Sequence, residues 1–331
     1  MSIYRGINGF AVQNYSSNPT LIDGQVWYNS TSKNLQLTKF VTAAWSTSGN
    51  LPQAGLTQVA GTGTQTSMLS FNGQAQPPNQ TTTNSQSYDG STWTAQAQMN
   101  TSRQQSTGSG ISNTSVLAFS GRLQPAAKSA ATESYNGSWT TQPNMGRAEY
   151  NLGGAGTGSA AVAFGAYSGG TVYPTESYNG SWTAGNPMSV GRSRNKGFGS
   201  SATSALTMGG ENGSGTNNNT ESWNGTNWTS VGVMNNARYA GAASSGSAAT
   251  DGLIAGGRGG PPSLILTSET WNGSSWTNGP SLLEQSALGA GAGASGSSAA
   301  ICGGTTNSPG NDSNKTQNFN SGAQVVAITS T

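Results

Sequence analysis

The order of apolar and polar positions repeats along most of the chain. Each repeat opens with a segment of very small residues, as in 151–159, 239–247 and 287–295, and continues with a short apolar run that is usually followed by glycine. The runs are MLSF (68–71), VLAF (116–119), AVAF (161–164), ALTM (205–208), GLIA (252–255) and AAIC (299–302). Continuous apolarity over so few residues is typical of a strand that is covered on both faces.

A hairpin is predicted after each of the first five runs. An aromatic residue, then Asn-Gly or Asp-Gly, then Trp-Thr predicts two strands joined by a tight turn, in which Asn and Gly adopt positive φ. The segments are QSYDGSTWT (86–94), ESYNGSWT (133–140 and 176–183), ESWNGTNWT (221–229) and ETWNGSSWT (269–277). We expect their aromatic side chains to pack between repeats; they are Tyr88, Trp93, Tyr135, Trp139, Tyr178, Trp182, Trp223, Trp228, Trp271 and Trp276.

The period of the repeat predicts the fold class. From Tyr88 to Phe319 the first aromatic of the repeat recurs every 43 to 48 residues, the length of a four-stranded blade of a β-propeller. Small residues suit the innermost strand, because blades converge on an axis. We therefore expect an all-β, kelch-like β-propeller of six four-stranded blades over residues 46–331, preceded by an N-terminal anchor or hairpin segment over residues 1–45.

The two ends of the chain leave an alternative. Phe40 and Trp45 stand 48 residues before Tyr88 and Trp93, so a partial seventh blade at the N-terminus stays open. At the other end, residues 323–331 lack glycine, proline and charge, and we expect them to supply the final strand. Because an exposed sheet edge invites association, we expect the N-terminal segment to cover that edge or to dock on another subunit.

The double glycines of TMGG (207–210), IAGG (254–257) and ICGG (301–304), each followed by an aromatic, resemble the kelch repeat. The sequence motif ESYNGSWT, with a following Met-x-x-x-Arg, is similar to motifs in kelch-type proteins of tailed phages that infect marine bacteria and cyanobacteria. The segment GQVWYNSTSKNLQLTKF (24–40) is similar to a hairpin near the start of phage tail-fibre and virion appendage proteins.

This resemblance implies a structural virion protein, tail-associated or fibre-associated and present in several copies. It would contact other virion proteins through its N-terminal segment and attach to bacterial surface polysaccharide. Two alternatives remain, namely a capsid decoration protein without a ligand of its own and a cellular kelch module for protein–protein interaction. Copper enzymes of the galactose oxidase type share the repeat, but their metal ligands do not occur in this sequence.

The residues that could carry chemistry argue against an enzyme. The chain has no histidine, the usual general base and metal ligand. Four of its carboxylates, Glu133, Glu176, Glu221 and Glu269, stand two residues before the repeat aromatic, so they form a ring rather than one pocket. We therefore expect no catalytic residue, no metal and no cofactor.

A matching set of arginines follows the repeated methionines and consists of Arg103, Arg147, Arg192 and Arg238. We interpret them as buried ion-pair partners of the repeated glutamates, with an anion-binding ring as the alternative. Cys302 stands where other repeats have Phe71 or Phe119, and we interpret it as a core residue.

Charge and hydropathy restrict the partners and the location. The net charge of +2 is the difference between 13 Lys and Arg and 11 Asp and Glu. The basic residues form no run, which argues against nucleic acid as a partner. No stretch approaches the roughly 20 apolar residues of a membrane span. The first residues also lack the regions of a signal peptide. We expect a virion protein made in the host cytoplasm, without membrane insertion.

Ligand binding is expected on the loops between the second strand and the hairpin, which differ most among the repeats. Recognition is usually carried by variable loops on a rigid scaffold. These loops should lie on the same face as the connections between blades. That face would gather Gln76, Arg122, Tyr167, Tyr173, Arg258 and Asn311, whose amide, hydroxyl, guanidinium and ring groups suit a carbohydrate or a protein surface.

Overall fold

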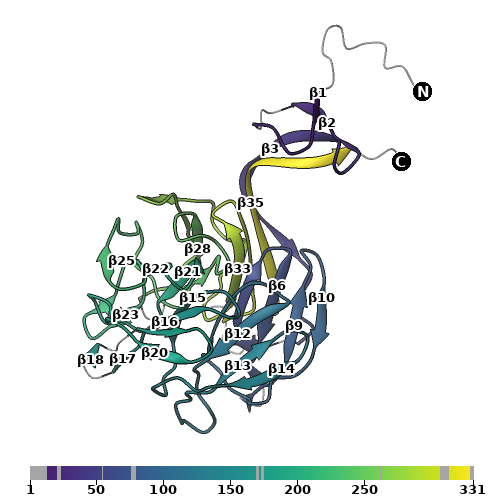
Figure 1. Ribbon diagram of the computed structural model, residues 1–331. Coiled ribbons are helices and arrows are strands. Elements are labelled where there is room, and N and C mark those ends of the chain that lie inside the picture. Colours follow the sequence, from purple (N-terminus) through teal and green to yellow (C-terminus); the bar gives the residue numbers. More distant parts are fainter. Residues whose placement is uncertain are drawn as a thin grey trace. The chain divides into compact units, whose positions relative to one another are not determined.

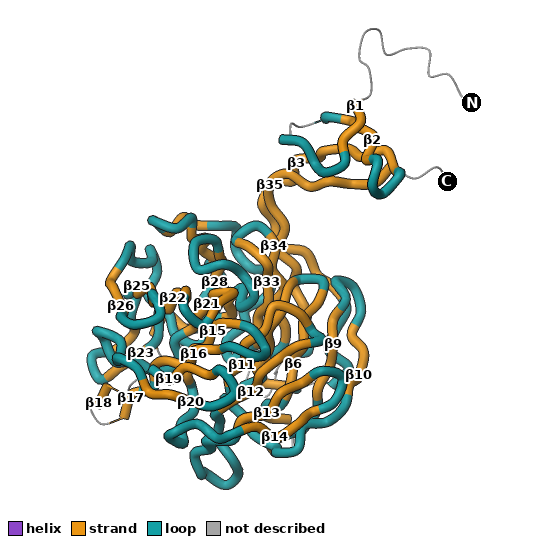
Figure 2. Tube along the Cα trace, in the orientation of Figure 1, coloured by secondary structure: helices purple, strands orange, loops and turns teal. Residues whose placement is uncertain are grey.

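The computed structural model describes residues 13–20, 24–53, 55–75, 80–168, 171–172, 175–260, 263–305 and 313–328, with backbone alone at 167–168, 171–172 and 323–328. Within these residues the chain consists of strands and loops (Figure 2). No helix there is long and apolar enough to cross a membrane. The predicted all-β class is confirmed.

The chain divides into two compact units. The larger unit is Trp45–Phe319, and the smaller one combines Met1–Ala44 with Asn320–Thr331. The predicted domains differ from this division at the C-terminus, because residues 320–331 belong to the smaller unit. The physical reason is that β3 (Asn34–Ser48) and β35 (Thr316–Ile328) are long paired strands that both continue through the boundary. Of the predicted strand 323–331, residues 329–331 lie outside the described residues.

The smaller unit contains the hairpin expected over residues 24–40. Strand β2 (Val26–Asn29) pairs antiparallel with β3, with Val26 opposite Leu37, and β1 (Gln13–Tyr15) pairs parallel with β2. Trp27 is fully buried.

The larger unit repeats one four-stranded antiparallel sheet (Figure 1). Its innermost strands are β5 (Ala60–Thr64), β11 (Thr107–Ser112), β15 (Leu152–Gly156), β21 (Lys196–Ser201), β27 (Ala242–Ala243) and β33 (Ala290–Ser295). The second strands are β6 (Ser67–Phe71), β12 (Ser115–Phe119), β16 (Ala161–Gly165), β22 (Ser204–Met208), β28 (Gly252–Ala255) and β34 (Ser298–Cys302). Below, each sheet is named by its innermost strand.

The hairpins supply the two outer positions. The third strands are β9 (Ser85–Tyr88), β13 (Thr132–Tyr135), β19 (Glu176–Tyr178), β25 (Thr220–Trp223), β31 (Ser268–Trp271) and β35. The outermost strands are β10 (Trp93–Gln96), β14 (Trp139–Gln142), β20 (Trp182–Ala184), β26 (Trp228–Ser230), β32 (Trp276–Asn278) and β3. The β33 sheet therefore takes its outermost strand from the N-terminal part of the chain.

The innermost strands are neighbours in the order β5, β11, β15, β21, β27, β33 and again β5. Small residues line them because there is no room for larger ones. A Cβ added to Gly61 would lie 2.8 Å from the Cβ of Ala290, and one on Gly154 would lie 2.6 Å from Cγ2 of Thr107. The predicted inner position of the small-residue segments is confirmed for these strands.

Tryptophan side chains of the outermost strands join each sheet to the preceding one. The Trp139 ring packs edge-on against Phe71 at a centroid distance of 5.4 Å, and its Nε1–H donates to Ser85 Oγ at 2.9 Å. Trp182, Trp228 and Trp276 make the equivalent contacts with the sheet before theirs. Trp93 donates to Thr316 Oγ1 at 2.9 Å, so the β5 sheet packs on the β33 sheet.

Trp45 occupies the same position in the β33 sheet. Its ring lies 5.2 Å from that of Phe319, and its Nε1–H donates to the Pro280 carbonyl oxygen at 3.1 Å. Phe40, in contrast, is 49% exposed and belongs to the smaller unit. The N-terminal aromatic that extends the repeat is therefore Trp45.

The hairpin turns differ from the prediction in one respect. Gly90, Gly137, Gly180, Gly225 and Gly273 have positive φ, but the preceding Asn or Asp residues do not. In several turns these residues act through their side chains instead. The oxygen Oδ1 of Asn224, for example, accepts hydrogen bonds from the backbone N–H groups of Thr226 and Asn227.

The predicted Arg–Glu pairs are confirmed. Arg103–Glu133, Arg192–Glu221 and Arg238–Glu269 are buried pairs with N–O distances of 3.3, 2.8 and 2.7 Å, and Arg147–Glu176 is a looser pair at 3.6 Å. Burial lowers the pKa of Arg103 to about 10, so its guanidinium stays charged at neutral pH.

Each of these glutamates also accepts a backbone N–H from the segment that enters its sheet, as Glu269 does from Asn235 at 2.7 Å. In the β33 sheet Gln317 accepts the equivalent bond, from Leu283 at 2.8 Å. A side-chain oxygen that accepts this backbone hydrogen bond therefore also occurs in a sheet that lacks the carboxylate charge.

Arg238→Met should destabilise the protein by about 3–5 kcal/mol, because Glu269 would remain as a buried charge without its partner. Arg238→Ser with Glu269→Gln should recover much of this loss, since it copies Ser286 and Gln317 of the β33 sheet. Urea unfolding of the single and double variants measures both effects. Equal losses in the two variants would contradict a role of the pair in balancing buried charge.

Trp45→Ala should cost about 3–5 kcal/mol of unfolding free energy, as expected for a large buried aromatic. The matched control is Val233→Ala, at an exposed side chain, which should stay within about 0.5 kcal/mol of the parent. Thermal and urea unfolding give both values. A loss below about 1 kcal/mol for Trp45→Ala would show that the N-terminal strand is not part of the cooperative core.

Candidate functional site

One face of the larger unit carries both the variable loops and the connections between sheets, as predicted. Isolated β-bridges join the two kinds of segment, including Gln104 with Arg122, Ser193 with Glu211 and Tyr239 with Arg258. Several loops form small sheets of their own, namely β4 (Leu56–Thr57) with β7 (Gln74–Ala75) and β8 (Gln80–Thr81), β17 (Tyr167–Ser168) with β18 (Thr171–Val172), β23 (Glu211–Asn212) with β24 (Gly215–Thr216), and β29 (Arg258–Gly260) with β30 (Ser263–Leu264). We call this the loop face.

The predicted binding residues are only partly described. Gln76, Tyr173 and Asn311 lie outside the described residues, and for Tyr167 the backbone alone is described. Arg122 and Arg258 occupy equivalent places, each directly after a pair of residues with positive φ that ends the second strand. The structure places these two arginines on one face, but in separate sheets.

A polar pocket of about 210 Å³ lies on this face between a loop of the β11 sheet and a loop of the β21 sheet. Two loops and two connections form it, and its lining residues are Lys128, Glu149, Tyr150, Asn151, Ser193, Arg194 and Glu211. Lys128 Nζ lies 2.9 Å from Glu149 Oε1, and Arg194 Nη1 lies 2.8 Å from Glu211 Oε1. We call this the loop-face pocket.

Arg194 connects the loop-face pocket to its surroundings. Its guanidinium carbon lies 5.7 Å from the centre of the Tyr239 ring, within cation–π range. Tyr239 in turn pairs through its backbone with Arg258. Glu211 and Tyr239 therefore hold the arginine from two sides at the edge of the pocket.

The mouth of the central axis is built from six non-glycine residues with left-handed backbone. Their φ values lie between 54° and 62°, and the residues are Gln58, Gln105, Asn151, Arg194, Ala240 and Leu288. From Gln105 to Leu288, each donates its N–H to the carbonyl oxygen of the equivalent residue one sheet earlier, at 2.9–3.1 Å. These bonds offset the strain of the conformation and hold the mouth open.

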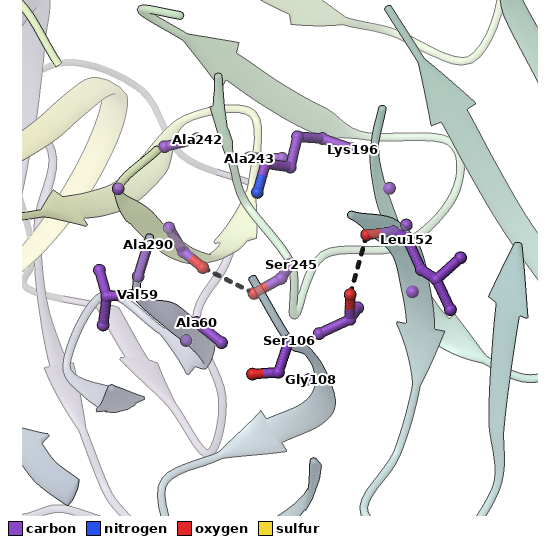
Figure 3. A pocket seen from close by; sticks show the side chains of 17 residues that line it. Val59, Ala60, Ser106, Gly108, Leu152, Lys196, Ala242, Ala243, Ser245 and Ala290 are labelled. Atoms are coloured by element: carbon purple, nitrogen blue, oxygen red, sulfur yellow. Dashed lines mark hydrogen bonds between the residues drawn. The ribbon is translucent and has the colours of Figure 1, made fainter. Parts of the chain in front are cut away.

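Below the mouth, a narrow channel of about 40 Å³ runs between the innermost strands (Figure 3). Its walls are backbone and small side chains such as Ala60, Ala243 and Ala290. Lys196 is the exception, and among the described residues that line the channel it is the one charged side chain. Figure 3 shows its amine directed into the channel beside Ala243.

Burial lowers the pKa of Lys196 to about 8. The side chain keeps some accessible surface, and it lines both the narrow channel and the mouth. No described residue forms an ion pair with its ammonium group or accepts a hydrogen bond from it. The charged form is therefore costly in the folded protein.

Cys302 is confirmed as a core residue. It is buried with Ala290 and Ala300, and burial raises the pKa of its thiol to about 12. A thiol that is both inaccessible and protonated is a poor nucleophile. Within the described part of the chain, no group of three His, Cys, Asp or Glu side chains could hold a metal ion.

Sequence reasoning missed both Lys196 and the loop-face pocket, although the repeat contained a signal for each. Opposite the last residue of each apolar run, other innermost strands have Ala60, Thr107, Gly153, Ala242 and Ala290, where β21 has Lys196. Glu149 stands four residues after Met145, at the place where other repeats have the buried arginine, because Arg147 comes two residues early. Both are departures from the repeat.

Comparison with protein-family models and with curated proteins found no match. Among the solved structures that are similar, one is described as the structure of YjhT. The similarity covers 84% of this chain and 96% of that chain, with a TM-score of 0.63 and 13% sequence identity. At this identity the likeness shows the fold alone. The larger unit is thus β-propeller-like.

The lowered pKa of Lys196 predicts a specific pH dependence. In the unfolded chain its pKa is about 10.4, so between pH 8 and about 10.4 the unfolded state binds more protons and stability rises with pH. Lys196→Met removes this titration. At pH 7 the variant should be more stable than the parent, by up to about 3 kcal/mol, and the difference should disappear by about pH 10.5.

Urea unfolding at pH 7 and pH 10.5 measures this difference. The buffer should contain gluconate as its anion, so that no anion reaches Lys196. Gluconate is too large for a channel of about 40 Å³. A parent that is more stable than Lys196→Met at pH 7 would contradict an uncompensated ammonium in the channel.

Proposed function

We propose that this protein is a non-enzymatic binding propeller of six blades that belongs to the particle of a tailed phage and uses its loop face to attach to bacterial surface polysaccharide. The observation that carries the binding role is the loop-face pocket, which variable loops and sheet connections build together on a rigid scaffold. The placement in a phage particle rests on the resemblance of the repeats and of residues 24–40 to virion proteins.

Six blades account for the arrangement of the sheets. The neighbour order of the innermost strands returns to β5 after β33. The bond from Trp93 to Thr316 and the packing of Trp45 on Phe319 join the ends of the repeat array. On this interpretation the N-terminal strand completes the sixth blade and does not begin a seventh.

A binding role is favoured over catalysis by the places of the repeated carboxylates. Glu133, Glu176, Glu221 and Glu269 are buried and hold arginines and backbone N–H groups. Glu149 and Glu211 of the loop-face pocket are also in ion pairs. Carboxylates held in this way are poor candidates for the proton transfers of glycoside hydrolysis.

The loop-face pocket suits one sugar unit of a longer chain. Its volume of about 210 Å³ is below the 300–1,000 Å³ or so of pockets for drug-sized ligands. Its lining offers amide, hydroxyl, ammonium and carboxylate groups for hydrogen bonds, together with the ring of Tyr150 for stacking. Repeated weak contacts from several copies on one particle would add up through multivalency.

An array of bacterial surface polysaccharides, probed with the full chain, tests the proposal. We expect binding to at least one polysaccharide, and about tenfold weaker binding for Lys128→Ala and Tyr150→Ala. The matched control is Thr140→Ala on the exposed side of β14, which should bind like the parent. No binding to any polysaccharide on the array would refute recognition of polysaccharide. Unchanged binding by both variants would exclude the loop-face pocket as the binding site.

A further inference from the structure

The central channel differs electrostatically from the rest of the molecule. Among the other described residues the buried charges occur in pairs, as in Arg192–Glu221 and Arg238–Glu269. Among the described residues that line the channel and its mouth, no Asp or Glu occurs, and the two charged residues are Arg194 and Lys196. Arg194 donates to Glu211 at 2.8 Å, which leaves the Lys196 ammonium as the uncompensated charge.

The walls of the channel cannot neutralise this ammonium by rearranging. The lining residues other than this lysine are glycine, alanine and small hydroxyl residues together with Val59 and Leu152, and hydrogen bonds between neighbouring sheets hold the walls in place. Ser245 Oγ donates to the Gly291 carbonyl oxygen at 2.8 Å, and Thr107 Oγ1 donates to the Leu152 carbonyl oxygen at 2.8 Å (Figure 3). A counter-charge must therefore come from outside the chain.

We propose that the axial channel binds one small monovalent anion at the Lys196 ammonium. The volumes of about 40 Å³ in the channel and about 30 Å³ at the mouth admit a halide ion or a single carboxylate group, but not a sugar ring or a sulfate with its hydration shell. Gln58, Gln105 and Asn151 are among the residues that line the mouth. This site is separate from the loop-face pocket, so it does not depend on the proposed function.

Binding at this place has a clear energetic cause. An ammonium that is removed from bulk water without a partner is destabilised, and an anion beside it restores the lost interaction. Because the anion would bind the folded chain and not the unfolded one, it stabilises the fold by mass action. The unfavourable burial of the Lys196 ammonium without a partner therefore favours the binding of an anion beside it.

Thermal unfolding of the full chain at pH 7 and constant ionic strength tests the proposal. Replacing sodium gluconate by sodium chloride should raise the midpoint of the parent by about 2 °C or more. The same exchange should leave Lys196→Met and Lys196→Gln unchanged. Two variants are used because each fills the channel differently, and either one alone could fold poorly.

Two further measurements define the ligand. If sodium acetate stabilises the parent as chloride does, the site accepts carboxylates, and if chloride acts alone, the ligand is a free halide; either result supports an anion site at Lys196. At pH 10 the chloride effect should shrink, because the Lys196 ammonium loses its proton. An equal chloride effect in the parent and in both variants, or none in the parent, would overturn the proposal.

Discussion

The packing of each outer tryptophan on the preceding sheet is the interaction on which the rest of the structure depends. A single four-stranded sheet has two faces to cover, and here the neighbouring sheet covers them. The indole of Trp139 lies on Phe71, and its Nε1–H reaches a hydroxyl of the third strand of that sheet. Each sheet therefore needs a preceding sheet to cover it, and the order of neighbouring innermost strands returns from β33 to β5. Trp45 meets this requirement for the β33 sheet.

The buried ion pairs have a different role. The repeated glutamate accepts a backbone N–H from the segment that enters its sheet, and the arginine balances the buried charge that results. Glutamine replaces this glutamate at Gln86 and Gln317, in the β5 and β33 sheets, which the two ends of the chain bring together. Gln317 keeps the hydrogen-bond acceptor, whereas Oε1 of Gln86 accepts no hydrogen bond from the described residues. The acceptor is therefore retained without the charge in the β33 sheet.

The repeat could be predicted from the sequence because its causes are local. Asn-Gly turns, apolar runs and small residues each specify one strand or turn, and the period of the aromatics orders them. The loop-face pocket could not be predicted in this way, because Lys128, Glu149, Arg194 and Glu211 come from four segments that only the closed arrangement of sheets brings together. The placement of residues 320–331 in the smaller unit could not be predicted for a similar reason, since β35, the partner of β3, continues beyond the last repeat aromatic. Both kinds of miss concern contacts between distant segments.

Hydrogen exchange under native conditions is the most direct test of closure by the N-terminal strand. If β3 completes the β33 sheet, the amides of residues 316–319 lie between two strands and should exchange as slowly as those of 132–135 in β13. Both segments should then exchange only through global unfolding. Exchange at 316–319 that is more than about tenfold faster than at 132–135 would contradict a ring closed by Trp45–Ser48.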